Sequence, residues 1–247
     1  SLQETNTLVK IAVVFRLIFI VATPCLSDDY FRFIWDGRLL VNGLNPYLFL
    51  PSEIINTNIA SATGLTEELY KGLNSPHYYT VYPPVNQLFF ALGGFFSQFG
   101  ILAGIIAIRI PIIIGEILLL IGIKKLLKYL QLPQYYVLWY ALNPLVIVEL
   151  SGNLHFEGMM LLFVVGGIYW LMQKRWKIAA FCWAFAIGTK LIPLLFLPVF
   201  IKQLGLKNST RLYLLVAMVL VAMFIPFVNQ QLVEHLFSSI NLYFQTF

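Results

Sequence analysis

A short acidic stretch holds the residues of this chain that are best suited to chemistry. Residues 27–37 read Ser-Asp-Asp-Tyr-Phe-Arg-Phe-Ile-Trp-Asp-Gly and directly follow an apolar segment. Asp28, Asp29 and Asp36 are the only aspartates of the chain. A carboxylate within reach of a hydroxyl can act as a general base, and charges at the mouth of a membrane segment indicate binding or catalysis. The plainer interpretation is a solvated loop in which Ser27 and the acids after it begin a helix.

The elements that must position these residues are apolar. Hydrophobic residues make up 60% of the sequence and charged residues 11%, and the mean hydropathy is +0.82. Soluble domains carry about 25% charged residues, so the composition predicts an all-α protein, a polytopic membrane helical bundle. Its helices are expected in the apolar stretches 8–26, 85–98, 101–123, 135–150, 158–173, 178–201 and 212–228.

The one long polar segment, residues 27–82, is expected to be a large external loop that carries short juxtamembrane helices. Its orientation follows from the cations, because cytoplasmic loops are enriched in lysine and arginine. With this segment outside, and if the stretch 85–98 runs inward, the stretch 101–123 must be broken to end inside again, and Pro111 is the expected break. The cations that predict the cytoplasmic side form three clusters: Lys124, Lys125 and Lys128; Lys174, Arg175 and Lys177; and Lys202, Lys207 and Arg211.

A second group of candidate residues follows later in the chain. The segment Asn-Pro-Leu-Val-Ile-Val-Glu-Leu-Ser-Gly-Asn-Leu-His-Phe-Glu (143–157) brings Glu149, His155 and Glu157 to a turn between two apolar stretches. Lys190 lies in the turn of an apolar hairpin, where a lysine either reaches for the interface or meets an anion. We therefore expect this second group to bind a ligand, with Lys190 at a phosphate.

Several classes of partner have no sequence signal here. No cysteine or histidine spacing completes a metal site, since His-x-Glu supplies two ligands at most. No glycine-rich phosphate loop is present. The net charge of +5 comes from loop clusters, so we expect a lipid bilayer and no nucleic acid as partner. Arg109 and Glu116, seven residues apart on one helical face, are expected to serve packing or pairing in the bundle.

Taken together, the motifs resemble those of a known superfamily. Ser-Asp-Asp-Tyr-Phe-Arg-Phe-Ile-Trp-Asp-Gly-Arg (27–38), with Gly-Leu-Asn-Pro-Tyr (43–47) and Tyr-Pro-Pro (82–84), resembles the polyprenol-phosphate-sugar-dependent glycosyltransferases of the GT-C superfamily, in particular bacterial mannosyltransferase-like members. The segment 143–157 and Gly-Thr-Lys-Leu-Ile-Pro (188–193) look like later signatures of that family. The motifs follow one another in the family's order and cover most of the chain.

The resemblance implies a membrane enzyme with a GT-C-like bundle. Such an enzyme moves a sugar, here mannose, from a polyprenyl-phosphate-linked donor to a hydroxyl of a glycan, lipid or protein acceptor. It also implies one transmembrane domain over residues 1–247, a fragment of a longer chain, in which the external loop 27–82 is catalytic. The active site would face the periplasmic or external side of a bacterial inner (plasma) membrane. The acidic residue that acts in the family's first external loop matches Asp28 and Asp29.

Sugar transfer to an alcohol gives the candidate residues their expected roles. A carboxylate takes the acceptor proton and cations stabilise the departing phosphate, and a single displacement predicts inversion at the anomeric carbon. No metal ligand is assigned and no particular cofactor is implied, while a divalent metal ion is left open. The assignments are Asp29 or Asp28 as the base with Asp36 orienting the acceptor or the base; Arg32, Arg38, Lys190 and His155 at the donor phosphate; and Trp35, Tyr47 and Glu157 at the sugar or acceptor.

Other classes of membrane protein stay open as alternatives. A membrane prenyltransferase holds magnesium ions with two aspartate-rich clusters, and this chain has aspartates for one. A scaffold subunit would be separated from an enzyme by substitutions in the acidic loop. A transporter or channel has no internal repeat in its favour here, although a polar path could use the intramembrane residues Arg16, Arg109, Glu116, Glu149 and Lys190.

Overall fold

The chain folds into helices and turns that form two compact units. The computed structural model describes residues 2–235 and 237–239, and no strand occurs among them. Unit 1 comprises Ser1–Ala22 and Arg109–Met223, and unit 2 comprises Thr23–Ile108 and Phe224–Phe247. The predicted all-α class is confirmed. The prediction of one transmembrane domain over 1–247 stays a prediction.

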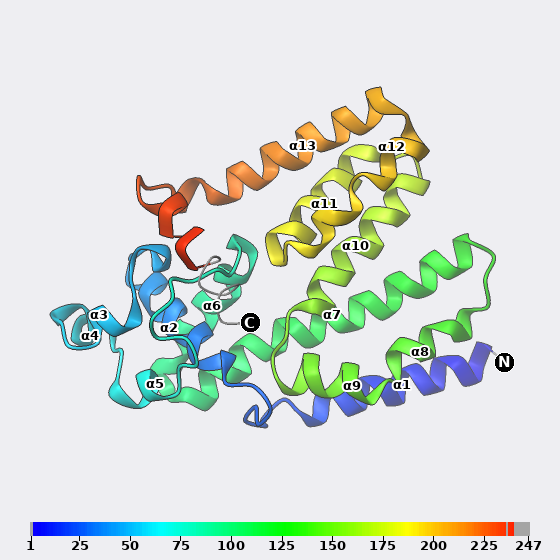
Figure 1. Cartoon of the computed structure of the whole chain (residues 1–247). Coiled ribbons are helices and arrows are strands. Elements are labelled where there is room, and N and C mark those ends of the chain that lie inside the picture. The colour runs from blue at the N-terminus through cyan, green and yellow to red at the C-terminus, as the bar shows by residue number, and fades with distance from the viewer. Residues whose placement is uncertain (1, 236, 240–247) are drawn as a thin grey trace. The chain divides into compact units, whose positions relative to one another are not determined.

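Unit 2 is built on two helices that lie side by side, α2 (Asp29–Val41) and α6 (Pro84–Phe96) (Figure 1). Gly37 of α2 faces the backbone of α6, and a Cβ atom placed on it would lie 1.8 Å from the Phe90 carbonyl oxygen. Glycine is required here because any side chain would occupy the space of the neighbouring backbone. The predicted polar loop with short helices is confirmed, and between α2 and α6 it contains η1 (Pro46–Leu48), α3 (Pro51–Ile54), α4 (Asn58–Thr63) and α5 (Glu67–Lys71).

Local sequence explains where these helices begin. The Thr66 side chain accepts a hydrogen bond from the Leu69 amide at 3.2 Å and caps α5, as threonine commonly does at a helix N-terminus. Pro84 occupies the first turn of α6, where its missing N–H leaves no helical hydrogen bond unmade. The start of α6 therefore fixes the backbone that leads into it, including Tyr82.

Helix α7 (Ile101–Tyr129) is continuous over 29 residues and follows the 3-10 helix η2 (Ser97–Phe99). Pro111 lies inside it, so the break expected at Pro111 is wrong. A proline is tolerated inside a membrane helix when neighbouring groups satisfy the freed backbone. The division between the two units falls within α7, after Ile108.

Unit 1 packs long apolar helices against one another. Figure 1 shows α10 beside α11, and Trp183 of α11 is buried in a cluster that also contains Leu212 and Val216 of α13. The segments of unit 1 besides α7 are α1 (Leu2–Ile18), η3 (Gln134–Tyr136), α8 (Val137–Ala141), α9 (Pro144–Val146), the π-helix η4 (Ile147–Gly152), α10 (Glu157–Met172), α11 (Trp176–Thr189), η5 (Ile192–Phe196), α12 (Val199–Leu204) and α13 (Leu206–Phe224).

Length and composition identify the membrane-spanning candidates among the described residues. Two segments, Ile101–Tyr129 and Leu206–Phe227, are long and apolar enough to cross a bilayer. The second is α13 continued by η6 (Ile225–Phe227). Pro144–Gly152 and Glu157–Met172 make a third if the pair counts as one span, and the chain bends by 110° between them. The predicted turn within 143–157 is thus confirmed as a sharp bend.

Candidate active site

The first turn of α2 presents the paired aspartates. Asp28 is the N-cap residue and is exposed, and Asp29 is the first helical residue and is partly exposed. The Ser27 hydroxyl accepts a hydrogen bond from the Asp29 amide at 3.3 Å. Carboxylates are stabilised at a helix N-terminus by the unpaired amides and the helix dipole. The helix start therefore keeps two negative charges beside each other at an accessible position.

A neutral donor from a later loop holds the Asp29 carboxylate. Asn74 donates from its amide nitrogen to Asp29 Oδ1 at 2.8 Å. Burial raises the pKa of the nearby Tyr82 well above its ordinary value, and the charge of Asp29 acts in the same direction. Within the part of the chain that the structure describes, Asp29 forms no ion pair and is held by this neutral amide.

One and two turns further along the same face of α2, the charged residues are buried. Arg32 donates to Asp36 Oδ1 at 2.8 Å, and the exposed fraction of the Asp36 side chain is 0%. Gln87 of α6 donates to the other Asp36 oxygen at 3.3 Å and to the Thr80 hydroxyl at 3.2 Å. Burial raises the pKa of Asp36, while Arg32, Thr80 and Gln87 act in the opposite direction. This ion pair is enclosed in unit 2.

The remaining donors of Arg32 bind the loop. Its Nη1 donates to the carbonyl oxygens of Tyr78 at 2.9 Å and Ser75 at 3.3 Å. Arg32 therefore ties residues 75–78 to α2, next to Asn74 and Tyr82. Of the predicted site residues, Asp36 thus pairs with Arg32, and Arg32 binds the loop that carries Asn74, the donor to Asp29.

The other predicted site residues of unit 2 lie in structural positions. Trp35 is fully buried, and Tyr47 is buried with its hydroxyl donating to the Tyr82 carbonyl at 2.5 Å. Arg38 donates to the Ser97 hydroxyl at 2.8 Å. It lies nine residues beyond Asp29 in α2, about 13 Å along the helix axis. The structure therefore does not gather Trp35, Tyr47 and Arg38 at the paired aspartates.

In unit 1 the predicted residues of the second group come together in pairs. Lys190, directly after α11, forms an ion pair with Glu157, which begins α10. His155 Nδ1 lies 3.4 Å from Glu149 Oε2. All four side chains are partly exposed, between 27% and 37%. Because two carboxylates face one lysine and one histidine, this cluster carries no net positive charge.

Arg109 of α7 holds the backbone that carries this cluster. It donates to the carbonyl oxygens of Ser151 at 2.8 Å and Gly152 at 2.9 Å, at the end of the π-helix. It also donates to the carbonyls of Ile20 and Ala22 after α1. The prediction that Arg109 serves packing or pairing is confirmed. Its partners are backbone carbonyls, which satisfy its charge where the chain bends.

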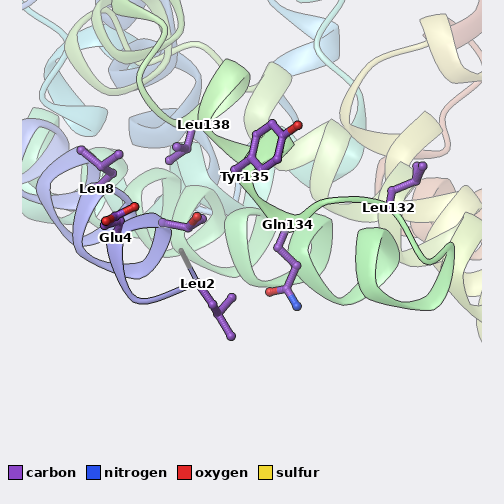
Figure 2. A pocket seen from close by; sticks show the side chains of 8 residues that line it. Leu2, Glu4, Leu8, Leu132, Gln134, Tyr135 and Leu138 are labelled. Carbon is purple, nitrogen blue, oxygen red and sulfur yellow. The ribbon is translucent and has the colours of Figure 1, made fainter.

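Figure 2 shows a different feature of unit 1, an open pocket of about 630 Å³ beside α1 and η3. None of the candidate residues lines it. Its lining residues are Leu2, Glu4, Thr5, Leu8, Leu132, Gln134, Tyr135 and Leu138. We therefore assign the candidate site to the polar side chains of the loop and not to this pocket.

Sequence reasoning missed the residues that position Asp29 and Asp36. Asn74 and Gln87 carried no signal, because their partners lie 45 and 51 residues away. Among the described residues, no group of three or more histidine, cysteine, aspartate or glutamate side chains is arranged to hold a metal ion.

The fold and the acidic loop define an all-α membrane protein with paired carboxylates at a helix start. Comparison with known proteins then gives the family. The profile described as "Alpha-(1->6)-mannopyranosyltransferase, N-terminal domain" matches residues 2–205. The chain belongs to this family, and the resemblance to GT-C mannosyltransferase-like proteins is confirmed.

Two curated relatives come from Mycobacterium tuberculosis (strain ATCC 25618 / H37Rv). Alpha-(1->6)-mannopyranosyltransferase A is 26% identical over 160 residues, which cover 63% of this chain and 29% of the relative. A second alpha-(1->6)-mannopyranosyltransferase is 26% identical over 162 residues, which cover 64% of this chain and 26% of the relative. The matched part is thus less than a third of each relative's length. No solved structure matches the chain.

Proposed function

We propose that this chain is the N-terminal part of a membrane mannosyltransferase that uses a polyprenyl-phosphate-linked mannose and an acceptor hydroxyl. Family membership supports mannosyl transfer, and the names of both relatives specify alpha-(1->6)-mannopyranosyl transfer. The observation that carries the proposal is the partly exposed carboxylate of Asp29, held by Asn74 beside the exposed Asp28. No observation favours a transporter, a prenyltransferase or a scaffold.

In this proposal Asp29 or Asp28 takes the proton of the acceptor hydroxyl as its oxygen attacks the anomeric carbon. The bond from that carbon to the phosphate oxygen breaks, and the polyprenyl phosphate leaves with the negative charge. A base must lie within about 2.6–3.2 Å of the proton-bearing oxygen, and the exposure of both aspartates allows this approach. Asp36 does not touch the acceptor in this proposal; it binds Arg32 and Gln87 and so helps to fix α2 in unit 2. A single displacement inverts the configuration of the anomeric carbon.

The departing phosphate needs a cation, and the four residues expected at the donor phosphate from the sequence stay the candidates for this role. Arg32 and Arg38 donate to protein oxygens within unit 2, and Lys190 and His155 pair with carboxylates within unit 1. A phosphate would compete with Glu157 for Lys190 and with Glu149 for His155, so the carboxylates released by that exchange could accept hydrogen bonds from sugar hydroxyls. Replacing Lys190 by methionine should raise the KM for the lipid donor more than replacement by arginine.

Transfer assays on the full-length protein test the proposed base. Membranes that contain the wild-type protein should transfer label from polyprenyl-phosphate mannose, and the product should have the anomeric configuration opposite to that of the donor. Asp29→Asn or Asp28→Asn should reduce transfer at least about 100-fold, the size of a lost general base. Glu67→Gln is the matched control, because Glu67 is an exposed carboxylate in the same loop. Full activity in both aspartate variants would refute the assignment.

We also propose that the loop 27–82 faces the outside of a bacterial inner membrane. Cys25 is exposed and precedes the paired aspartates by three residues. A membrane-impermeant maleimide added to intact spheroplasts should label Cys25, and Cys25→Ser should remove that label. Labelling that requires the membrane to be opened would place the loop on the cytoplasmic side instead.

A further inference from the structure

The described residues from the end of η6 onward lie against the polar loop of unit 2 (red in Figure 1). The Asn45 side-chain amide donates to the Phe227 carbonyl at 2.8 Å, and the Tyr79 backbone amide donates to the Ser239 hydroxyl at 2.9 Å. The partners of these two hydrogen bonds are 182 and 160 residues apart in the sequence. A late part of the chain is therefore joined to the early polar loop at two separate points.

Two aromatic rings lie face to face where these segments meet. The rings of Tyr79 and His235 are stacked, with centroids 3.8 Å apart and an angle of 10° between their planes. His235 Nδ1 lies 3.0 Å from the Tyr47 carbonyl oxygen. A carbonyl oxygen can only accept, so Nδ1 carries the hydrogen, and Nε2 of the neutral ring is then an acceptor. His235 is thus fixed in its position and in its tautomer.

The outer polar atoms of this ring pair are available to a ligand. Both side chains are partly exposed, and in the part of the chain that the structure describes, neither the Tyr79 hydroxyl nor His235 Nε2 forms a hydrogen bond. Burial and the charges of Glu53 and Glu234 raise the pKa of Tyr79, so its hydroxyl keeps its proton and can donate. Sites for small ligands combine aromatic side chains with a few placed polar groups. A sugar ring matches this combination, because it has an apolar C–H face and hydroxyls that both donate and accept.

The loop that carries Tyr79 also carries the residue that holds Asp29. Asn74 donates to Asp29 Oδ1 at 2.8 Å, and Arg32 of α2 donates to the Tyr78 carbonyl at 2.9 Å. Tyr79 follows Asn74 by five residues, which span at most about 18 Å when fully extended. The ring pair and the candidate base therefore lie on one anchored loop, at a separation that a short chain of sugars can bridge.

We propose that Tyr79 and His235 form a subsite for a sugar residue of a glycan acceptor. This inference rests on the proposed function. His235 follows the membrane-spanning candidate Leu206–Phe227 by eight residues, so the ring pair lies outside that span. The donor carries its mannose on a lipid phosphate, whereas a glycan acceptor approaches through solution and has further sugar residues to bind. The subsite holds one of these residues while another presents its hydroxyl to Asp29.

Kinetics and direct binding with the full-length protein in detergent test this subsite, with an α-(1→6)-linked mannose oligosaccharide as the probe. Tyr79→Phe keeps the stacked ring and removes the hydroxyl, so the KM for the oligosaccharide should rise about 3- to 10-fold, the size of one hydrogen bond. His235→Asn keeps an amide that can donate to the Tyr47 carbonyl but removes the ring and Nε2, and should raise this KM about 10-fold or more. In both variants kcat and the KM for the lipid donor should stay within about twofold. The Kd of the oligosaccharide, measured calorimetrically without donor, should rise by the same factors as its KM.

Tyr70→Phe is the matched control. Tyr70 is a partly exposed tyrosine of the same polar loop, and its ring also contacts another ring, that of Trp35, with centroids 6.1 Å apart. This variant should keep the wild-type KM and Kd for the oligosaccharide. The melting temperatures of the Tyr79 and His235 variants should lie within about 2 °C of the wild type.

The outcomes separate the subsite from the function on which it rests. If Asp29→Asn abolishes transfer while the Tyr79 and His235 variants bind and use the oligosaccharide like the wild type, the subsite is refuted and the proposed function stands. A rise in the KM for the lipid donor alone would assign the ring pair to the donor and refute the acceptor subsite. A lower melting temperature with an unchanged Kd would show that the pair only joins the two segments, which also refutes it. If the wild type neither transfers mannose nor binds the oligosaccharide, the function and the subsite fall together.

Discussion

Replacing Gly37 by alanine should force α2 away from α6. The added Cβ atom would lie 1.8 Å from the Phe90 carbonyl oxygen, 2.6 Å from its carbonyl carbon and 2.8 Å from the Gly94 nitrogen. All three are backbone atoms, which cannot rotate aside as a side chain could. Ordinary contact begins at 3.4 Å, so the two backbones would have to separate by about 1.5 Å.

Separating the two helices should lower the free energy of unfolding. Overpacking a core costs about 1–3 kcal/mol, and more when the backbone has to shift, so we expect about 3 kcal/mol or more. For a chain of this size, 1 kcal/mol corresponds to about 2–4 °C in melting temperature. Gly37→Ala should therefore melt about 6–12 °C below the wild type in detergent. Because Asp29 lies on the same helix, the sugar-transfer activity of the Gly37→Ala protein should fall as well.

Gly122→Ala is the control of opposite sign. Gly122 lies inside α7, and a Cβ atom there would meet Val165 Cγ1 at an ordinary 3.5 Å. Alanine is favoured over glycine inside a helix by about 1 kcal/mol, so this variant should melt a few degrees above the wild type. A Gly37→Ala protein that melts within about 2 °C of the wild type would refute the close approach of α2 and α6.

Three further perturbations test the buried charges. Arg32→Met leaves Asp36 buried without its cation and should destabilise the protein by about 3–5 kcal/mol. The double variant Arg32→Met with Asp36→Leu should recover most of this loss of stability. Equal melting temperatures for the single and double variants would contradict this prediction. Arg109→Met removes the hydrogen-bond donor of four backbone carbonyls and should lower the free energy of unfolding by about 3 kcal/mol or more. Lys128→Met, at an exposed position of the same helix, is the control and should melt like the wild type. Because burial raises the pKa of Asp36, the stability linked to its protonation is present below the ordinary aspartate value of about 3.9 and is lost as the pH rises through the raised value. Thermal unfolding between pH 4 and pH 7 should accordingly show a smaller loss of stability in Asp36→Asn than in the wild type, and an identical pH dependence would show that Asp36 does not titrate differently in the folded state.

Composition and local pattern predicted the class and the location of the acidic site. The excess of apolar residues predicted helices, and the turn composition of 143–157 predicted the bend that the structure places there. Asp28 and Asp29 could be identified because charge directly after an apolar segment is unusual. Helix formation, the bend and the position of the paired aspartates all depend on residues that are close in the sequence, so a local pattern can predict them.

Burial and partners could not be predicted in the same way. Asp36 and Trp35 were expected at the acceptor or the sugar, yet both are fully buried. Asp36 binds Gln87 of α6, which lies 51 residues later in the sequence. Lys190 was expected at the donor phosphate, and in the structure it pairs with Glu157, 33 residues earlier. Pro111 was expected to break a helix, and the long apolar sequence around it continues the helix instead.

The contrast between Asp29 and Asp36 gives the strongest physical reason to place the chemistry at the start of α2. The two residues lie on the same face of one helix, about two turns apart. Asp36 is fully buried and paired with Arg32, so an acceptor hydroxyl cannot reach it. Asp29 is partly exposed and receives a hydrogen bond from the Asn74 amide. This neutral donor orients the carboxylate and leaves other lone pairs free for a substrate hydroxyl. Of these two aspartates, Asp29 is therefore the one that an acceptor can approach.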